Sequence, residues 1–444
     1  MSPVRFTSQP PPVNANAVAG AFGSKGRAIM LKCIGARRHR VWGIGPQAMR
    51  ALVALCAAAV CALLTCPAAS QTYQVLHSFK GEPDGAYPQA SLTMDASGNL
   101  YGTTYQGGLG FGTVFKRDLE GHQTVLYSFK GASDGSYPLH AGVILDSNGN
   151  FYGTTFAGGA HGYGTVFKLT SSGKETILYS FSGSSGDGAY PYAGLVRDSA
   201  GNLYGTTAFG GGANYCGVVY KISSTGKETV LYRFADQPDG ANPYSSLIRD
   251  SAGNLYGTTY RGGQADRGTI FKITSSDKEA ILYNFTGAPG DGSNPYSELI
   301  RDSAGNFYGT TYVGGKSGLG TVYELNAQGV ETVLYNFTGL KHDGSHPYAG
   351  VVRDSSGNLF GTTYDGGDLS CSSPGCGMVF ELNSAGKETV LHIFEGHRGK
   401  FTDGSWPFAG LVRDSAGNLY GTTNKGGKYS PLEQRVGTVF KLTP

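Results

Sequence analysis

The stretch Gly-Asn-Leu-Tyr-Gly-Thr-Thr recurs seven times along the chain, with Phe for Leu or Tyr in some copies, and limits the possible folds more than any other feature. The copies occupy residues 98–104, 149–155, 201–207, 253–259, 305–311, 357–363 and 417–423. They begin 51, 52, 52, 52, 52 and 60 residues apart. A repeat of this length is typical of folds in which each copy builds one supersecondary unit. Each copy therefore marks one structural unit.

Within a unit, short runs rich in β-branched and aromatic residues alternate with turn residues. In the third unit the runs are residues 191–198, 203–207, 218–222 and 228–234. The Gly and Asn residues between them accept the positive φ that tight turns require. No window of 11 or more residues has the periodicity of a helix. The pattern predicts an antiparallel meander of four strands in each unit.

Seven such meanders predict an all-β fold, a seven-bladed β-propeller of four-stranded antiparallel blades. An open β-solenoid is the alternative, but its coils are usually shorter and less hairpin-like. The 71 glycines among 444 residues fit a fold with many tight turns. Charged residues make up only 15% of the chain, as expected when both faces of each blade pack against neighbours.

The phase of the repeat predicts how the ring closes. The first unit is preceded by a lone fourth strand at residues 74–79, and the chain stops after a third strand at residues 437–442. We therefore expect the N-terminal strand to complete the last blade. Its apolar side chains would be Val75, Leu76 and Phe79.

Residues 1–70 lie outside the repeat and are predicted to be a signal peptide with an extended basic region. They contain eight Lys or Arg and no Asp or Glu, followed by an apolar run at 51–64 and a stretch of small residues. The run is shorter than the roughly 20 residues of a membrane span, so no span is expected in the mature chain, 71–444. Met1, Met30 and Met49 are the alternative starts. Cys66 suits a lipoprotein signal poorly.

Removal of this segment changes the net charge. Lys and Arg fall from 35 to 27, while Asp and Glu stay at 32, so the mature chain is near −5. A mildly acidic exported protein gives no reason to expect a nucleic-acid partner. Cys371 and Cys376 share one loop and are a candidate disulfide, which leaves Cys216 unpaired. We expect a monomer that is secreted, periplasmic or at the cell surface.

The repeat resembles the GloVer tandem-repeat family of bacterial surface or secreted proteins, which carry various anchors. The pattern in the fourth unit comprises residues 230–234, Asp239-Gly240, Pro243, residues 253–259, Gly262-Gly263 and residues 268–272. All seven units carry it, so the resemblance covers nearly the whole mature chain. It implies export and a propeller-like repeat, and it supplies no catalytic residues.

The loops that vary among units are the best guide to a binding site. The connection between the second and third strands and the connection between blades vary in length, and both emerge on one face of a propeller. Either ligand contacts or solvated loop residues are expected there. The candidate ligand-binding residues are His161, Tyr163, Tyr215, Arg267, Lys316, Tyr429 and Arg435.

Two sets of aspartates repeat. Asp precedes Gly in every unit and could bind a hard cation such as calcium, but Asp-Gly is also turn chemistry, which is the favoured interpretation. No other cofactor is expected. The second set, which precedes each Gly-Asn, is predicted to cap hairpins on the opposite face, beside arginines that pair with neighbouring blades. The weak metal candidates of the first set are Asp134, Asp187, Asp239, Asp291 and Asp343.

Catalysis would require residues that break the repeat. His140, Glu298 and His346 do so, and they could perform acid–base chemistry if they converged at the channel mouth. The sequence favours a binding module for an extracellular ligand, carbohydrate or protein, because 28 Tyr and 22 Phe provide many aromatic faces. Aromatic residues also favour strands. An enzyme (polysaccharide lyase, glycosidase or lactonase) and a structural envelope protein remain the alternatives.

Overall fold

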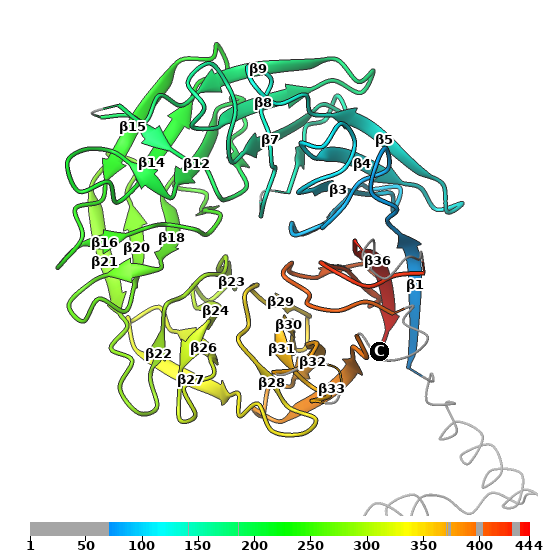
Figure 1. Cartoon of the computed structure of the whole chain (residues 1–444). Helices are drawn as coiled ribbons and strands as arrows, with labels where there is room; N and C mark the ends of the chain where they lie inside the picture. Colours follow the sequence, from blue (N-terminus) through cyan, green and yellow to red (C-terminus); the bar gives the residue numbers. More distant parts are fainter. Residues whose placement is uncertain are drawn as a thin grey trace, which may run out of the picture. The chain divides into compact units, whose positions relative to one another are not determined.

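A computed structural model describes residues 71–140, 142–184, 186–369, 371, 374–396, 403–428 and 436–444. The chain divides into two units, Met1–Ala69 and Ser70–Pro444, and all described residues belong to the second. They form seven four-stranded antiparallel sheets arranged around a central axis (Figure 1). This confirms the predicted seven-bladed propeller. Within the described ranges, no helix is long and apolar enough to cross a membrane.

Each blade runs outward from a strand of two residues to a long outer strand. The innermost strands are β2 (Thr93–Met94), β6 (Ile144–Leu145), β11 (Val196–Arg197), β17 (Ile248–Arg249), β23 (Ile300–Arg301), β29 (Val352–Arg353) and β34 (Val412–Arg413). The second strands are β3 (Leu100–Thr104), β7 (Phe151–Thr155), β12 (Leu203–Thr207), β18 (Leu255–Thr259), β24 (Phe307–Thr311), β30 (Leu359–Thr363) and β35 (Leu419–Thr423).

The outer half of each blade is built from longer pairings. The third strands are β4 (Thr113–Arg117), β8 (Thr165–Leu169), β14 (Val218–Ile222), β20 (Thr269–Ile273), β26 (Thr321–Leu325), β32 (Met378–Leu382) and β36 (Thr438–Thr443). The fourth strands are β5 (Gln123–Ser128), β9 (Glu175–Ser180), β15 (Glu228–Arg233), β21 (Glu279–Asn284), β27 (Glu331–Asn336), β33 (Glu388–Ile393) and β1 (Thr72–Ser78).

Two-residue ribbons tie the blade connections to the loops after the second strands. They pair β10 (Gly188–Ala189) with β13 (Phe209–Gly210), β16 (Gly240–Ala241) with β19 (Arg261–Gly262), β22 (Gly292–Ser293) with β25 (Val313–Gly314), and β28 (Gly344–Ser345) with β31 (Asp365–Gly366).

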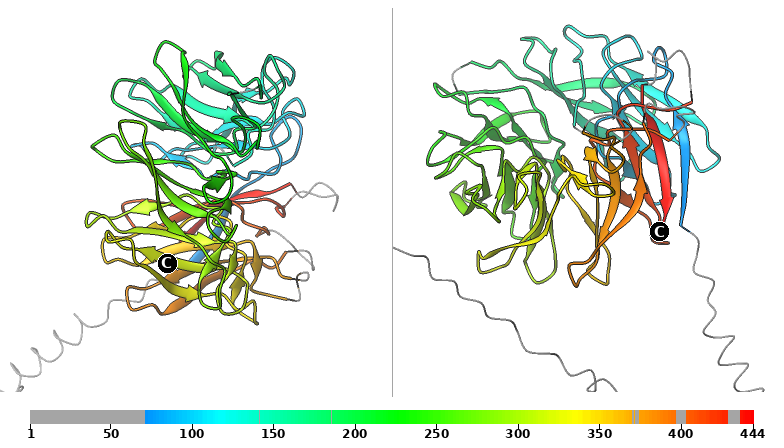
Figure 2. Two further views of the ribbon diagram at one scale, coloured as in Figure 1. Left: turned by 90° about the vertical axis from the view of Figure 1, so that its left-hand side faces the viewer. Right: turned by 60° about the horizontal axis from the view of Figure 1, so that its bottom comes forward.

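The ring closes as predicted. β1 pairs antiparallel with β36, from Thr72 opposite Thr443 to Ser78 opposite Thr438, with a bulge between Val75 and His77. The two strands lie side by side in Figure 1 and in the right-hand view of Figure 2. β1 therefore forms the outer edge of the last blade, whose other three strands come from the C-terminal repeat.

The hairpin end of each repeat is a hydrogen-bonded cap. In the third blade Asp198 accepts the Asn202 backbone N–H at 2.9 Å, the Asn202 Nδ2 at 2.8 Å and the Tyr204 hydroxyl at 3.0 Å. Gly201 has a φ of +86°, in the left-handed region that favours glycine. The turn between the first two strands is thus fixed by Asp, Gly, Asn and Tyr of the repeat.

The rest of the repeat packs the blades together. Gly205 is required because a Cβ there would lie 2.5 Å from the Tyr220 hydroxyl. Thr206 donates a hydrogen bond to the Ser245 carbonyl of the next blade at 3.2 Å. As expected, the arginines ending the inner strands reach the preceding blade, and Arg249 lies 5.7 Å from the Tyr204 ring centroid.

The first strand is shorter than the sequence predicted. Of residues 191–198, only Val196–Arg197 pairs in the sheet of the third blade. Pro191 has no N–H for a ladder, and Tyr190 before it has a φ of +56°, which is incompatible with a strand. The segment between Pro191 and Val196 therefore runs toward the axis on the face that carries the variable loops, which we call the loop face.

Candidate functional site

The residue before each of these prolines adopts the left-handed conformation in all seven blades. Such φ values are uncommon for residues other than glycine and cost free energy. Two backbone hydrogen bonds stabilise the turn: the Asn242 N–H donates to the Cys216 carbonyl at 2.8 Å, and the Tyr260 N–H donates to the Asn242 carbonyl at 3.1 Å. The seven residues, with φ from +54° to +59°, are Tyr87, Tyr137, Tyr190, Asn242, Asn294, His346 and Trp406.

These turns project an aromatic ring toward the axis from most blades. Neighbouring rings contact in a closed cycle with centroid distances of 5.0, 4.9, 4.9, 5.0, 4.9 and 5.6 Å. His140 takes part because its blade has one extra residue after the proline. Gln89 occupies the seventh position. The axial ring, as we name it, consists in order of His140, Tyr192, Tyr244, Tyr296, Tyr348 and Phe408.

A second tier of aromatic residues surrounds the axial ring. They directly follow the second Thr of the repeat, and Ala208 and Asn424 replace them in two blades. Their centroids lie 4.5 to 5.7 Å from members of the axial ring, except for Tyr105, which contacts Tyr137 at 5.0 Å. With the axial ring they form the aromatic face. The outer tier is Tyr105, Phe156, Tyr260, Tyr312 and Tyr364.

The axial ring is neutral, and the aromatic face is half-buried. Burial raises the pKa of Tyr244 and of Tyr364 to about 12, and it raises the pKa of Tyr296 further. Burial lowers the pKa of His140 to about 4, against the effect of a hydrogen bond to the Gln89 backbone. At neutral pH these groups are therefore neutral. The axial ring offers flat rings and hydroxyl donors without formal charge, whereas Arg261 and Asp365 lie beside tyrosines of the outer tier.

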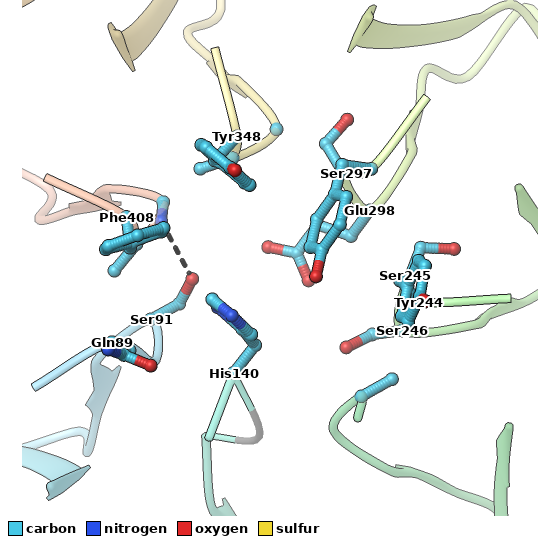
Figure 3. Close-up of a pocket in the computed structure, with 16 residues that line it drawn as sticks. Gln89, Ser91, His140, Tyr244, Ser245, Ser246, Ser297, Glu298, Tyr348 and Phe408 are labelled. Atoms are coloured by element: carbon cyan, nitrogen blue, oxygen red, sulfur yellow. Dashed lines mark hydrogen bonds between the residues drawn. The ribbon is translucent and has the colours of Figure 1, made fainter. Parts of the chain in front are cut away.

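A cavity of about 50 Å³ lies at the axis next to the axial ring (Figure 3). It has room for about four water molecules. Ser91 Oγ accepts a hydrogen bond from the Gly410 N–H at 3.0 Å, and Ser246 Oγ accepts one from the Gly194 N–H at 3.0 Å. Glu298 extends into the opening, and burial raises the pKa of its carboxyl.

The three candidate catalytic residues are not brought together. His140 and Glu298 both line the axial cavity, but His346 does not. His346 Nδ1 lies 3.0 Å from Asp365 Oδ2, and its ring packs 4.9 Å from the Tyr312 ring. The acid–base arrangement considered from the sequence would thus be limited to His140 and Glu298.

The loop candidates lie scattered around the rim. His161, Tyr215, Arg267 and Lys316 are exposed, and Tyr215 stacks on a neighbouring ring at 5.9 Å. Tyr163 is half-buried. Sequence reasoning on variable loops missed the axial ring, although the recurring aromatic after proline was a usable signal. Two further candidates, Tyr429 and Arg435, lie outside the described residues.

The Asp-Gly aspartates sit in separate turns around the ring. Asp187, for example, accepts the Ser182 N–H and the Gly188 N–H, both at 2.7 Å. Each of the five metal candidates also faces a glutamate that begins the fourth strand of the next blade, which the sequence analysis did not single out. Burial, then the aspartate charge, raises the pKa of each glutamate to about 7: Glu175, Glu228, Glu279, Glu331 and Glu388.

Two other features complete the inventory. Within the described ranges, the one group of three potential ligand side chains is Asp118, Glu120 and His122, at an open hairpin end. Cys371 and Cys376 form a disulfide with a Cα–Cα distance of 6.0 Å, and Cys216 is free and buried.

Comparison with solved structures finds matches at low sequence identity. The extracellular domain of a putative one-component system from B. thetaiotaomicron matches at 9% identity and a TM-score of 0.51, over 83% of this chain and 40% of that one. PorZ, a surface component of the type-IX secretion system of Porphyromonas gingivalis, matches at 15% identity and 0.48, over 82% and 47%. A putative gluconolactonase matches at 10% and 0.39, over 84% and 92%.

These likenesses are limited to the fold. This chain spans less than half the length of the first two proteins, which are an extracellular domain and a surface component. No curated protein matches. The model of the Gloeobacter/Verrucomicrobia repeat matches residues 62–266, 198–402 and 247–444, which together include every blade. The chain belongs to the Gloeobacter/Verrucomicrobia repeat family.

Proposed function

We propose that this protein is an exported binding module that holds an extracellular ligand, carbohydrate in the first instance, on the aromatic face. The single observation that carries the proposal is the continuity of the two aromatic tiers around the axis on the loop face. Residues 1–70 would direct export as a signal peptide. The extracellular and surface character of similar propellers supports this location.

The chemistry of the face suits sugars. Aromatic rings with polar tips provide apolar area together with a hydrogen-bond donor. The apolar C–H face of a sugar ring can stack on them, while neighbouring tyrosine hydroxyls donate to sugar oxygens. The neutral axial ring also favours a neutral ligand, because none of its own groups carries a charge that has to be desolvated. The 50 Å³ cavity is too small for a sugar ring, so the ligand would lie on the face and not within the channel.

An enzyme is the competing function, and the site favours it less. With its pKa lowered to about 4, His140 is neutral and a weak base. Glu298 lies in the small cavity beside the axial ring, without room for a substrate between it and His140. Two groups that cannot flank a reacting bond do not make an acid–base pair.

Glycan-array binding followed by titration calorimetry tests the proposal. Tyr260→Ala and Tyr312→Ala remove rings of the outer tier and should weaken binding at least tenfold. Tyr260→Phe keeps the ring and should lose less affinity than Tyr260→Ala. Leu119→Ala is the matched control, because Leu119 is exposed on the opposite face and 72% accessible. A blank array, or equal affinity in all four variants, overturns the carbohydrate site; turnover of an array hit would establish the enzyme instead.

A further inference from the structure

The axial cavity contains one feature that the aromatic face does not explain, the carboxylate of Glu298. It is the one acidic side chain among the described residues that line the cavity, and no Lys or Arg lines it. Within the described residues, no hydrogen-bond or ion-pair partner accompanies this carboxylate. The Glu298 side chain is half-buried where it lines the cavity, and burial raises the pKa of its carboxyl. A buried charge without a partner is costly.

The seven blades place equivalent residues around this carboxylate. Three residues after the proline in six of the blades, and four after it in the second, the chain has Ser91, Gly142, Gly194, Ser246, Glu298, Gly350 and Gly410. The glycines make room at the axis: a Cβ on Gly350 would lie 3.2 Å from Glu298 Cγ, and one on Gly410 would lie 3.6 Å from Glu298 Oε1. The single long side chain of this set therefore lies in space that Gly350 and Gly410 leave open.

The glycine of the seventh blade lies beside both the carboxylate and a serine hydroxyl. The same Cβ on Gly410 would lie 3.0 Å from Ser91 Oγ. Glu298 Oε1 and Ser91 Oγ thus both lie near Gly410, yet they form no direct hydrogen bond. Figure 3 shows the Glu298 carboxylate pointing to the middle of the opening, with Ser91 and Ser246 on opposite sides.

We propose that the axial cavity binds one small cation through the Glu298 carboxylate, with serine hydroxyls, cavity-facing oxygens and water completing its coordination. Every polar side chain that lines the cavity, His140 apart, presents oxygen: Gln89, the serines, the tyrosines and Glu298. Hard cations prefer such ligands, and Ca²⁺ takes six to eight of them. One carboxylate with neutral oxygens suits a weak site, of the affinity found in extracellular modules.

This site is independent of carbohydrate binding. A cation at the axis would neutralise the buried charge and tie the blades that supply its ligands, whether or not a sugar lies on the aromatic face. It is also separate from the Asp-Gly turns and from the exposed group at Asp118, so variants can distinguish the three locations.

Thermal melts of chelator-treated protein with added Ca²⁺, Mg²⁺, Na⁺ or K⁺ test the proposal. One of these cations should raise the melting temperature in a saturable way, as expected for a ligand of the native state. Luminescence of bound Tb³⁺ excited through the nearby tyrosines gives a second readout. Glu298→Gln is nearly isosteric and should abolish both responses. Gly410→Ala keeps the charge of Glu298 but narrows the cavity, and it should lower the affinity for the cation at least tenfold.

Glu331→Gln serves as the matched control, because it removes a carboxylate at the start of β27 that faces an Asp-Gly turn, and it should leave the cation response unchanged. A response that survives in Glu298→Gln would place the cation elsewhere and overturn the proposal. A wild type that does not respond to any of the cations would also overturn the proposal. If Glu298→Gln is then more stable than the wild type at high pH only, the carboxyl is held as the neutral acid. Sugar binding that persists in Glu298→Gln separates this outcome from failure of the aromatic face.

Discussion

Removal of β1 is the sharpest test of how the ring is held together. A chain that starts at Lys80 loses Phe79, which is 1% exposed, and the half-buried Val75 and Leu76. Full burial of a large apolar side chain contributes about 1.5–3 kcal/mol. With about 2.5 kcal/mol for Phe79 and about 1 kcal/mol for each of the other two, these three side chains account for about 4–5 kcal/mol of lost burial. The ladder to β36 is lost as well.

This loss translates into a measurable shift of the melting temperature. Unfolding entropies of about 2.1 cal/mol/K per residue give roughly 0.8 kcal/mol/K for a propeller of about 370 residues. If unfolding is two-state, the truncated chain should melt about 5–6 °C below the chain that starts at Gln71. Circular dichroism near 215 nm, or calorimetry, follows the transition. The exposed edge of β36 should also promote association, visible by size-exclusion chromatography.

A matched pair of substitutions tests whether the seam between the last and the first blade contributes as much stability as a seam between consecutive blades. Phe79 contacts Phe115 of the first blade at 5.3 Å, and Phe285 contacts Tyr323 of the next blade at 5.2 Å. Both phenylalanines are buried, so each Phe→Ala substitution should cost about 3–5 kcal/mol. A peptide of residues 71–80 added in trans should restore the truncated chain. Equal melting temperatures of the two chains, or a neutral Phe79→Ala, would refute this account of closure.

The remaining predictions concern charge and the disulfide. Burial next to Asp291 raises the pKa of Glu331 from 4.5 to about 7, so this carboxyl stabilises the fold below pH 4.5, and that stability is lost as the pH rises through about 7. Glu331→Gln should therefore melt at a higher temperature than the wild type at pH 8 but not at pH 4. An equal increase at both pH values would contradict this prediction. Asp302→Asn should cost about 1 kcal/mol at neutral pH, because the ionised Asp302 accepts the hairpin bonds and these bonds lower its pKa. In urea melts this cost should shrink as the pH falls below 3.8 and through the lowered pKa of the folded state, whereas a constant cost would contradict the prediction. Reduction of the Cys371–Cys376 disulfide should lower the free energy of unfolding by about 2 kcal/mol, because the unfolded chain gains the entropy of the opened loop. The melting temperature should fall accordingly, and an unchanged melting temperature in dithiothreitol would contradict this prediction.

The fold was predictable because its information is local and repeated. Asp198, Gly201 and Asn202 specify a turn by hydrogen bonding and by φ, and seven copies of that turn set the register of every blade. Closure was predictable for the same reason, since residues 74–79 carry the pattern of a fourth strand without the preceding three. Turn chemistry and strand alternation act over a few residues, so they can be interpreted without knowledge of the fold.

The site was less predictable because it is built from long-range coincidence. Tyr192 and Tyr244 meet at 4.9 Å although 52 residues separate them. Their approach depends on a left-handed turn before proline, which the sequence analysis treated as the start of a strand. The glutamates facing the Asp-Gly turns were missed for a related reason: Glu331 meets Asp291 only across a blade seam.

In a closed repeat, the informative departures are those at positions that converge. The variable loops of the rim carry exposed residues such as His161 and Lys316. The position of Glu298 is different, because all seven equivalents approach one axis and a Cβ on Gly350 would already lie 3.2 Å from Glu298 Cγ. Only one long side chain fits, and a second carboxylate would add like-charge repulsion in a poorly solvated space. A single acidic residue at such a position therefore limits the other six to small residues, and this makes it a stronger candidate for selected chemistry than any loop residue of the rim.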